Sequence, residues 1–515
     1  MQDLLNNIPN LSSGTIGIER ETLRTNTDAY LSQTLHPESL GNVYTHKNIT
    51  IDYAESLLEL VTDTHNNPEN LYLQLLNLHK FTAQNINNEL LWPTSMPCIL
   101  PDNPELIEFG YFGQSNGGKI KRLYRSGLAY RYGRPMQMIA GIHFNYSPSQ
   151  DFWNYLSQYK KQKLNQNFKN EIYMAALRNI GRTSWLVCYL FGASPACDFS
   201  FQPAQQLLTR HHKRSLIWNN ACTLRMSQLG YQNKADFSVD FNNLEAYIKD
   251  LIYAVLTPSP IYEYIGIQAP DGNYRQISTN ILQIENEYYA SARPKQIPNK
   301  NEAPTLALAR RGILYLELRL PDCNPYSPVG ISLEQIYFLE TYMLYCLMKN
   351  SPEIKHCEQD EINRNRLRAA CCGLSKDLKL SYHCKEKSMK SWALEILEEM
   401  LKIAAIMDKN TDKELYQNSV REQIKAVESG EVLAAKVRND LIDKDFINFA
   451  QELQNKHLTV LKSPLDSETK QELNNLRNKS LEDFAKIEKA AENQIPFSEY
   501  LEHYFDELKA FARES

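Results

Sequence analysis

The spacing of apolar residues divides the chain into a mixed first part and a final part that is almost wholly helical. Short alternating segments between residues 14 and 62 predict strands, and leucines three or four residues apart after Asn67-Pro68 predict a helix over 68–91. Amphipathic runs rich in Glu, Lys, Leu and Ala predict helices beyond about residue 332. Between these parts we expect Gly- and Pro-punctuated strands over 92–150, helices at about 166–190 and 241–257, and strands near 275–289 and 312–320.

The first predicted strand contains two glutamates on one face. Successive side chains of a strand point to opposite sides of the sheet, so Glu19 and Glu21 share a face and lie roughly 7 Å apart. This distance suits two neighbouring cations. A solvent-exposed strand with Arg20 and Arg24 as ion-pair partners is the more common meaning of such a pair, so the two glutamates by themselves do not establish a metal site.

A later predicted strand, residues 313–320, has one leucine face and one polar face. We expect the leucines at even positions to be core. The opposite face presents Tyr315, Glu317 and Arg319, and a carboxylate beside a guanidinium suits a site for a metal and a phosphate. An ordinary surface ion pair fits the same residues.

A third predicted strand, residues 137–145, places a histidine among polar and apolar neighbours. Alternation puts Gln137, Ile139, His143 and Asn145 on a common face. A lone histidine is more often a structural residue than a metal ligand, so His143 is a candidate ligand only in the company of other ligands.

Two further carboxylates complete the acidic set. Asp52 ends a short apolar strand, and Glu59 lies inside another, where an unpaired buried carboxylate costs several kcal/mol. A cation, an arginine or a raised pKa must therefore compensate Glu59. Many oxygen ligands with few histidines indicate Mg²⁺ or Mn²⁺ rather than zinc, and Mg²⁺ in turn suggests a nucleoside triphosphate. The chain has no GxxxxGK[ST] loop, and Gly117-Gly118-Lys119 alone is a weak phosphate signal.

Composition excludes several classes of protein. The formal net charge of -5 argues against a nucleic-acid binder. The sequence contains no apolar stretch near the ~18 residues of a membrane span, and its N-terminus lacks the pattern of a signal peptide. The cysteines form no CxxC pair, which predicts scattered thiols in a reducing compartment. We therefore expect a cytoplasmic protein without a membrane partner.

Several segments resemble, in order and spacing, the proteobacterial glutamate-cysteine ligases, also called gamma-glutamylcysteine synthetases. They span residues 15 to 330. These are Gly17-Ile18-Glu19-Arg20-Glu21-Thr22-Leu23-Arg24, Thr45-His46-Lys47 through Asp52, Trp92-Pro93-Thr94-Ser95-Met96-Pro97-Cys98, Leu190-Phe191-Gly192-Ala193-Ser194-Pro195, Leu282-Gln283-Ile284-Glu285-Asn286-Glu287, and Asn324-Pro325 through Gly330.

The resemblance implies an α+β fold similar to the catalytic half of glutamine synthetase: a curved antiparallel sheet surrounded by helices, with a largely helical C-terminal third. It implies a single catalytic unit over 1–515, with a sheet-bearing core at 10–335 and a helical region at 336–515 packed on it. The implied reaction is ATP-dependent ligation of the L-glutamate γ-carboxylate to the L-cysteine amine through a γ-glutamyl phosphate, the first step of glutathione biosynthesis. Glutathione is an implied feedback inhibitor.

The resemblance also implies roles for individual residues. Arg319 falls at the position that touches the transferred phosphate. The implied metal ligands, for Mg²⁺ or Mn²⁺, are Glu19, Glu21, Asp52, Glu59, His143 and Glu317. The implied acceptor pocket consists of Tyr53, Tyr124, Leu128, Gln137, Ile139, Arg225, Tyr231 and Tyr289, with Tyr53 in place of an expected Phe.

Two other functions remain open at this point. A carboxylate-amine ligase of the same fold with a different acceptor would use the same metals and differ in the pocket. A catalytically silent nucleotide- or metal-binding regulator would keep the fold, although here every candidate ligand and Arg319 are present. Beyond residue 330 the resemblance fades, because Arg368-Ala369-Ala370-Cys371-Cys372-Gly373 lacks the expected Gly- and basic-rich turn. We expect this third to be a helical scaffold that supports the sheet.

Overall fold

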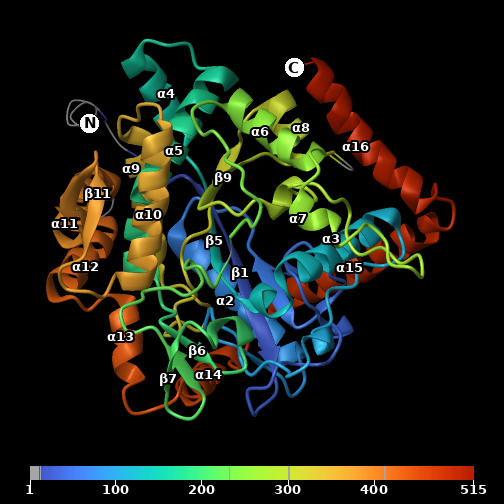
Figure 1. The fold of residues 1–515 in the computed structure, drawn as a ribbon. Helices are drawn as coiled ribbons and strands as arrows, with labels where there is room; N and C mark the ends of the chain where they lie inside the picture. Colours follow the sequence, from blue (N-terminus) through green and yellow to red (C-terminus); the bar gives the residue numbers. More distant parts are fainter. Residues whose placement is uncertain are drawn as a thin grey trace.

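An antiparallel sheet lies at the centre of the computed structural model, which describes residues 8, 11, 13–230, 232–299, 302–410 and 413–514 (Figure 1). Its strands follow the order β2-β3-β1-β5-β10-β9, with β4 paired to the end of β1, and every pairing is antiparallel. The strands are β1 Thr15–Thr25, β2 Ile49–Ile51, β3 Leu57–Val61, β4 Leu90–Leu91, β5 Ile142–Ser147, β9 Ala292–Lys295 and β10 Tyr315–Leu318.

Helices surround this sheet. Two smaller sheets lie outside it, one formed by β6 Ala196–Asp198, β7 Thr209–His211 and β8 Ser215–Ile217, the other by β11 Lys379–Tyr382 and β12 Lys385–Ser388. The α-helices are α2 Pro68–Asn85, α3 Asn116–Tyr132, α4 Gln150–Lys160, α5 Gln166–Phe191, α6 Leu244–Leu256, α7 Pro260–Glu263, α8 Pro304–Arg311, α9 Leu333–Met348, α10 His356–Cys372, α11 Met389–Met407, α12 Leu415–Ser429, α13 Leu433–Asp440, α14 Phe446–Leu461, α15 Ser467–Ala491 and α16 Phe497–Glu514. Short 3₁₀ helices are η1 Glu38–Leu40, η2 Pro104–Leu106, η3 Pro135–Met138, η4 Gln202–Ala204, η5 Glu285–Glu287 and η6 Asp408–Asn410.

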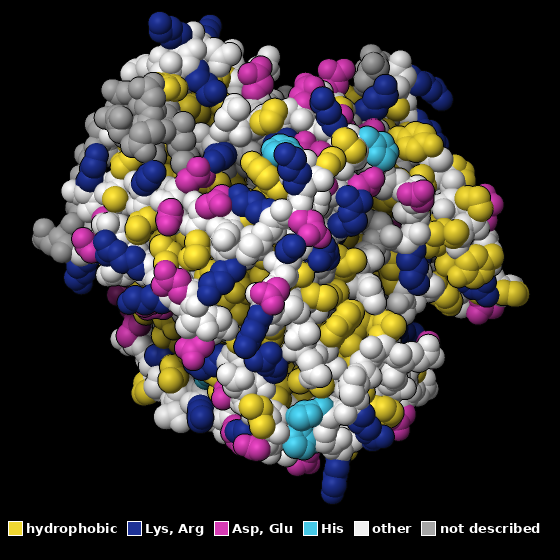
Figure 2. Space-filling view, turned by 60° about the vertical axis from the view of Figure 1, so that its left-hand side comes forward, with side chains coloured by type: hydrophobic (Ala, Val, Ile, Leu, Met, Phe, Trp, Pro, Cys, Tyr) yellow, Lys and Arg dark blue, Asp and Glu magenta, His cyan; other side chains and the backbone are white. Residues whose placement is uncertain are grey.

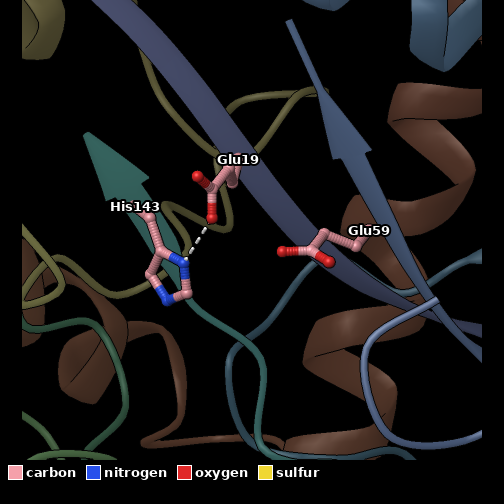
Figure 3. A group of neighbouring side chains, drawn as sticks. All are labelled: Glu19, Glu59 and His143. Carbon is pink, nitrogen blue, oxygen red and sulfur yellow. Dashed lines mark hydrogen bonds and ion pairs between the residues drawn. The ribbon is translucent and has the colours of Figure 1, made fainter. Parts of the chain in front are cut away.

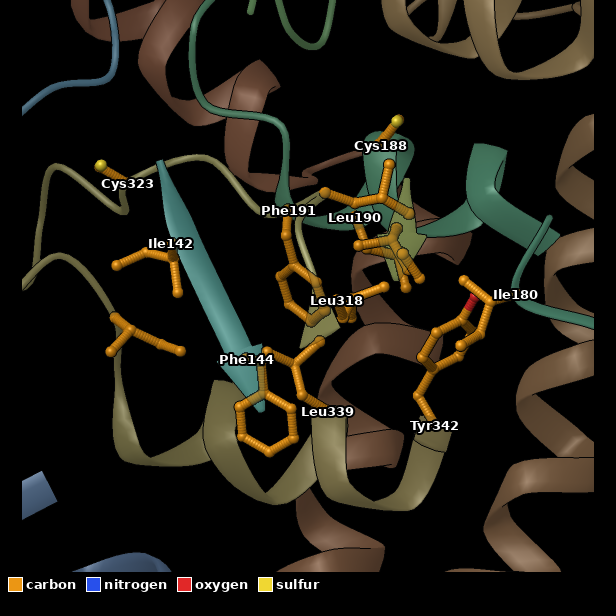
Figure 4. Close-up of a cluster of buried hydrophobic side chains, with 14 of the residues drawn as sticks. Ile142, Phe144, Ile180, Cys188, Leu190, Phe191, Leu318, Cys323, Leu339 and Tyr342 are labelled. Carbon is orange, nitrogen blue, oxygen red and sulfur yellow. The ribbon is translucent and has the colours of Figure 1, made fainter. Parts of the chain in front are cut away.

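One face of the sheet packs against α5 and α9. Figure 4 shows Phe144 of β5 and Leu318 of β10 beside Phe191 of α5 and Leu339 of α9. The Phe191 ring meets Phe338 edge-on, with 5.0 Å between centroids. Burial of this apolar layer leaves the opposite face of the same strands for polar side chains.

Most predicted elements are confirmed. The strands between residues 14 and 62 are β1, β2 and β3, and α5 and α6 occupy the two central helical segments. The predicted helix over 68–91 is α2, which begins as expected, with the Asn67 side chain accepting a hydrogen bond from the Asn70 amide and Pro68 in the first turn. Its predicted end is wrong, because α2 stops at Asn85 and residues 90–91 form β4, which pairs with β1. The final third is helical apart from the β11–β12 hairpin.

The predicted strands over 92–150 are largely wrong. Residues 116–132 form the 17-residue helix α3, which Ser115 caps by accepting a hydrogen bond from Gly118. A glycine at position 127 lowers the helix propensity of this segment. A Cβ atom at this position, however, would lie only 1.9 Å from Gln283 Oε1. A tertiary contact therefore requires this glycine inside a helix.

Three further expectations need correction. Gln137 lies in η3 and Ile139 is its C-cap, so β5 begins only at Ile142 and the two residues do not share a strand face with His143. The predicted strand at 275–289 is instead irregular chain with η5, because strand pairing to β10 begins at Ala292. Leu314 precedes β10 and is 45% exposed, outside the core.

The C-terminal helices extend along the outside of the molecule. Figure 1 shows α15 and α16 running past α3 toward α6 and α8. Contacts join α16 to both α3 and α6. Among the described residues, no helix is long and apolar enough to cross a membrane. A boundary at residue 335 between core and helical region stays a prediction.

Charges of both signs are distributed over the surface. On the face that Figure 2 shows, Lys and Arg side chains are interspersed with Asp and Glu, and no continuous basic area covers its described part. Interspersed charge of this kind is typical of a solvated surface.

A buried carboxylate joins the start of β1 to two C-terminal helices. Glu340 of α9 accepts hydrogen bonds from the Ser13 hydroxyl at 2.8 Å, the Gly14 amide at 2.7 Å and the Tyr416 hydroxyl at 2.8 Å. Burial raises the pKa of Glu340 to about 7, although these hydrogen bonds oppose the shift. Because the pKa of Glu340 is higher in the folded than in the unfolded protein, the contribution of this carboxyl to stability is complete below about pH 4 and is lost as the pH rises to 7.

We expect Glu340→Gln to flatten the dependence of stability on pH. The amide is neutral throughout, so the free energy of unfolding should fall less between pH 5 and 8 than in the parent, by about 3 kcal/mol. Urea unfolding at several pH values measures this difference. The exposed Glu472 on α15 offers the control Glu472→Gln. Parallel curves for the parent protein and Glu340→Gln would contradict the prediction.

Candidate active site

The register of the sheet brings distant acidic residues and one histidine onto the same face. Glu19 of β1 lies opposite His143 of β5, and Glu21 lies opposite Glu59 of β3. On β10, Glu317 is opposite Asn145. Side chains of directly paired residues lie on the same side of an antiparallel sheet, with Cβ atoms about 5 Å apart. Figure 3 shows Glu19, Glu59 and His143 pointing toward one another.

His143 lies at the centre of this cluster. Its Nδ1 atom is 3.0 Å from Glu19 Oε2 and 3.6 Å from Glu317 Oε1, and its Nε2 atom is 3.5 Å from Glu21 Oε1. One ligand atom from each of Glu19, Glu59 and His143 lies within 4.8 Å of the other two. A metal ion between these atoms would therefore have both carboxylate and imidazole ligands within reach.

The other face of β1 confirms the predicted alternation. Arg20 is buried with 3% exposure and donates to the Trp92 carbonyl at 3.2 Å. Arg24 forms an ion pair with Glu89. Neither arginine pairs with Glu19 or Glu21 in these contacts, so the solvent-exposed ion-pair interpretation of the two glutamates is wrong. Glu21 Oε2 instead accepts a hydrogen bond from the Gly141 amide at 2.7 Å.

The carboxylates crowd one another electrostatically. Burial raises the pKa of Asp52 to about 6, with a further contribution from Glu21. Burial, together with the charges of Glu19, Asp52 and Glu21, raises the pKa of Glu59 well above its usual range. Like charges in one site disfavour simultaneous ionisation. A bound divalent cation would allow all of them to be ionised.

Cations surround Glu317. The Arg319 guanidinium donates to Glu317 Oε1 at 2.8 Å, and Lys295 Nζ is 3.4 Å from Glu317 Oε2. Burial acts to raise the pKa of Glu317, but Lys295, Arg319, His143 and Arg293 outweigh it and the pKa lies well below the usual range. Burial acts to lower the pKa of Arg319, but the charges of Glu317, Glu21, Glu19 and Asp52 outweigh it and raise the pKa. Both groups are therefore charged at neutral pH.

Three cations of this site escaped the sequence prediction. Arg293 and Lys295 alternate on β9, and Arg293 lies opposite Glu317. Their strand was expected at 275–289, so their common face with Glu317 was missed. Arg125 of α3 donates to the Asp52 carbonyl. Arg125 follows Tyr124 in α3. Its place in the site could be predicted only if residues 116–132 were recognised as a helix.

The predicted acceptor residues lie on several different elements. Tyr124 and Leu128 belong to α3, Gln137 to η3, and Tyr289 to the chain before β9, while Tyr231 lies outside the described residues. Burial raises the pKa of Tyr124, Glu287 and Asp52 add to the shift, and Arg293 opposes it, so the phenol is within electrostatic range of the acidic face.

Arg225 links the acceptor residues to Arg319. Its Nη2 atom donates to the Arg319 carbonyl at 2.8 Å. Its guanidinium also lies against Gly141, where a Cβ atom would be 2.2 Å from Nη2. Tyr53 and Gln137 are buried, and the Tyr53 hydroxyl and Gln137 Nε2 have no hydrogen-bond partner among the described residues. Unpaired buried polar groups are typical of sites that a ligand completes.

The metal-binding prediction agrees with two features of the described residues. His143 Nε2 and Glu317 Oε2 are buried without a hydrogen-bond partner in the described part of the chain. The crowded carboxylates provide the hard oxygen ligands that Mg²⁺ and Mn²⁺ prefer. The residues present therefore fit a divalent cation.

Comparison with known proteins identifies the chain. Residues 3–369 match the sequence profile of the glutamate-cysteine ligase family. A glutamate–cysteine ligase from Alcanivorax borkumensis is 39% identical over 501 residues, which cover 95% of each chain. One from Hahella chejuensis is 40% identical over 508 residues, covering 95% of this chain and 94% of the relative.

Solved structures agree in fold. The crystal structure of glutamate–cysteine ligase from Francisella tularensis in complex with AMP superimposes with a TM-score of 0.91, at 32% identity, covering 97% of this chain and 99% of that one. A bifunctional glutathione synthetase from Pasteurella multocida has the same fold over 89% of this chain and 54% of its own, with a TM-score of 0.69 and 22% identity. The expected α+β fold with an antiparallel sheet is confirmed.

The fold and its acidic sheet face define an ATP-dependent ligase that joins a carboxylate to an amine. The chain belongs to the glutamate-cysteine ligase family. It is an enzyme of the first step of glutathione biosynthesis, in which the side-chain carboxylate of glutamate is joined to the amine of cysteine at the expense of ATP.

Proposed function

We propose that the acidic face of the sheet binds the divalent cations that accompany ATP. The raised pKa values of Asp52 and Glu59 support this proposal, because burial and then the neighbouring carboxylates disfavour the ionised forms that a bound cation would stabilise. The His143 Nε2 and Glu317 Oε2 atoms also support it, because both are buried and neither makes a hydrogen bond to another described residue. The proposed ligands of Mg²⁺ or Mn²⁺ are Glu19, Glu21, Asp52, Glu59, His143 and Glu317.

Arg319 is the proposed catalytic residue for phosphoryl transfer. The glutamate side-chain carboxylate attacks the γ-phosphorus of ATP, which forms a γ-glutamyl phosphate and releases ADP. A guanidinium offers several donors in a planar fork that matches phosphate oxygens. Glu317 holds this guanidinium at 2.8 Å, so the donors are oriented before the substrate arrives. Bound cations supply neutralisation of the remaining phosphate charge.

The acceptor pocket lies beside this face in the proposal. The cysteine amine attacks the acyl carbon of the γ-glutamyl phosphate, and inorganic phosphate leaves. Much of the acceleration comes from holding amine and acyl carbon in contact. The proposed pocket residues that the structure describes are Tyr53, Tyr124, Leu128, Gln137, Ile139, Arg225 and Tyr289, and Tyr231 is proposed on the resemblance alone.

The choice of acceptor is tested by phosphate release. With ATP, Mg²⁺ and glutamate present, we expect the purified protein to release phosphate when cysteine or 2-aminobutyrate is added. Unrelated amines should support far lower rates, since they do not fit a pocket built for a small amino acid. Reactions without glutamate are the control, and added glutathione shows whether this peptide competes with the substrates. Equal rates with unrelated amines would contradict the cysteine assignment and favour a ligase with another acceptor.

A further inference from the structure

A long irregular segment lies between α7 and β9. Within residues 264–291 the structure has η5 as the only regular helix or strand, and every residue of this segment is described. Tyr289 lies near its end, so the segment contributes one side of the proposed acceptor pocket. Long connections without regular structure depend on side-chain contacts for a defined shape, and they are often functional.

A buried ion pair fixes this segment to α3. Arg131 of α3 and Glu287 of the segment have fully buried side chains, and Arg131 Nη1 is 2.9 Å from Glu287 Oε1. The remaining donors of Arg131 also reach the segment. Nε donates to Gln276 Oε1 at 2.9 Å, Nη2 donates to the Ser278 carbonyl at 2.7 Å, and Nη1 donates to the Ile281 carbonyl at 3.3 Å.

Glu287 makes a matching set of contacts. Its Oε1 atom accepts a second hydrogen bond from the Tyr132 hydroxyl at 2.9 Å, and its Oε2 atom accepts one from the Gln283 amide at 2.9 Å. The Gln283 side chain fills the space beside Gly127 and donates to the Tyr124 carbonyl at 3.3 Å. The segment is thus held to α3 along more than one turn of the helix.

Both elements joined by this ion pair contribute residues to the proposed acceptor pocket. Leu128 and Tyr124 lie on α3, about one and two turns before Arg131 respectively. Tyr289 lies two residues after Glu287, and its ring meets the Tyr132 ring edge-on at 5.6 Å between centroids. A change in the Arg131–Glu287 contact would therefore alter the distance between Tyr289 and Tyr124.

We infer that Arg131 and Glu287 are positioning residues that set the geometry of the acceptor pocket. Burying two charges adds little net stability compared with apolar residues of the same size. The directional hydrogen bonds of both groups instead specify one arrangement of the segment on α3. The inference rests on the proposed acceptor pocket. It implies that this ion pair controls how tightly the enzyme binds the acceptor amino acid.

Kinetics of two variants test the inference. Glu287→Gln keeps the shape but removes the charge, and Tyr132→Phe removes only the hydroxyl that donates to Glu287. We expect the KM for cysteine to rise roughly tenfold in Glu287→Gln and about threefold in Tyr132→Phe, with KM for ATP and glutamate within about twofold of the parent. Thermal melting reports whether each variant is folded.

A second buried carboxylate provides the matched control. Asp198 in the three-stranded sheet is fully buried and binds the Arg214 guanidinium through both oxygens, at 2.7 and 2.9 Å. Asp198→Asn is expected to lower the melting temperature without changing KM for cysteine. This control separates the general effect of losing a buried ion pair from a specific effect on the acceptor pocket.

Several outcomes would overturn the inference. An unchanged KM for cysteine in folded Glu287→Gln would do so, and so would parallel changes in kcat and in the KM of all three substrates. Should Glu287→Gln not fold, Tyr132→Phe decides by the same criteria.

A third variant, Leu128→Ala, tests the acceptor pocket itself. An unchanged KM for cysteine in Leu128→Ala would contradict the proposed pocket. A raised KM for cysteine in Leu128→Ala, with unchanged values in Glu287→Gln and Tyr132→Phe, would contradict only the positioning role.

Discussion

Turnover in Glu317→Gln is expected to fall by three orders of magnitude or more. Glu317 is 1% exposed, lies 3.6 Å from His143 Nδ1, and orients Arg319 at 2.8 Å. The amide has the same shape, so β10 should still pair with β5 and β9. It has no charge, however, and both a divalent cation and the Arg319 guanidinium would lose their anionic partner.

Activity and metal binding are measured together on this variant. Steady-state kinetics at saturating substrates give kcat, and calorimetric titration with Mn²⁺ gives the affinity for the cation, which we expect to weaken at least tenfold. The circular dichroism spectrum should match that of the parent. Glu19→Gln is expected to behave in the same way, because Glu19 contacts the same histidine at 3.0 Å.

A matched control exists outside the acidic face. The Glu302 side chain is 4% exposed and pairs with both Arg310 and Arg311, yet it is not part of the acidic face of the sheet. Glu302→Gln should reduce stability and leave kcat and Mn²⁺ affinity within about twofold of the parent. Near-normal turnover in Glu317→Gln or Glu19→Gln would refute the metal assignment.

Arg319→Lys is expected to lower kcat by about 10³-fold with little change in KM for cysteine. The lysine keeps one positive charge but loses the planar fork that can hold two phosphate oxygens at once. Removal of one oriented donor from a site of developing charge costs roughly 10²–10³ in kcat, and arginines at phosphoryl-transfer sites contribute up to 10⁵.

Separate measurement of phosphoryl transfer locates the defect. The glutamate-dependent release of ADP from ATP, measured in single turnover with and without cysteine, should slow in Arg319→Lys to the same extent as the complete reaction. Arg310→Lys on α8, an exposed arginine paired with Glu302 and Glu507, is the control and should have the kcat of the parent. A loss of less than tenfold in Arg319→Lys would contradict a contact with the transferred phosphate.

The alternation of side chains along β1 and β10 was predictable from sequence because it depends only on local geometry. A strand repeats every two residues, so Glu19 and Glu21 had to share a face whichever strands lay beside them. The same rule separates Glu317 and Arg319 from Leu316 and Leu318, and the structure confirms that separation. The rule did not extend to Leu314, because β10 begins one residue later.

The errors arose where tertiary contacts outweighed local preference. Gly117, Gly118 and Gly127 resemble breaks in a helix, yet α3 includes all three. At Gly127 the Gln283 side chain leaves no room for a Cβ atom, so the contact with a segment far along the chain requires the residue that disfavours the helix. With α3 missed, Arg125 and the Arg131–Glu287 pair were also missed.

By itself the sequence determined the helical final third, the two-residue alternation of the strands, and, through the resemblance, the family. Only the tertiary structure decided the register that puts Glu19 opposite His143 and Glu21 opposite Glu59. Periodicity is a property of one segment, whereas register depends on pairing between segments far apart along the chain, such as those of Glu19 and His143, which are 124 residues apart. The acidic face exists because β3, β1, β5 and β10 pair in this order, and no single strand contains it.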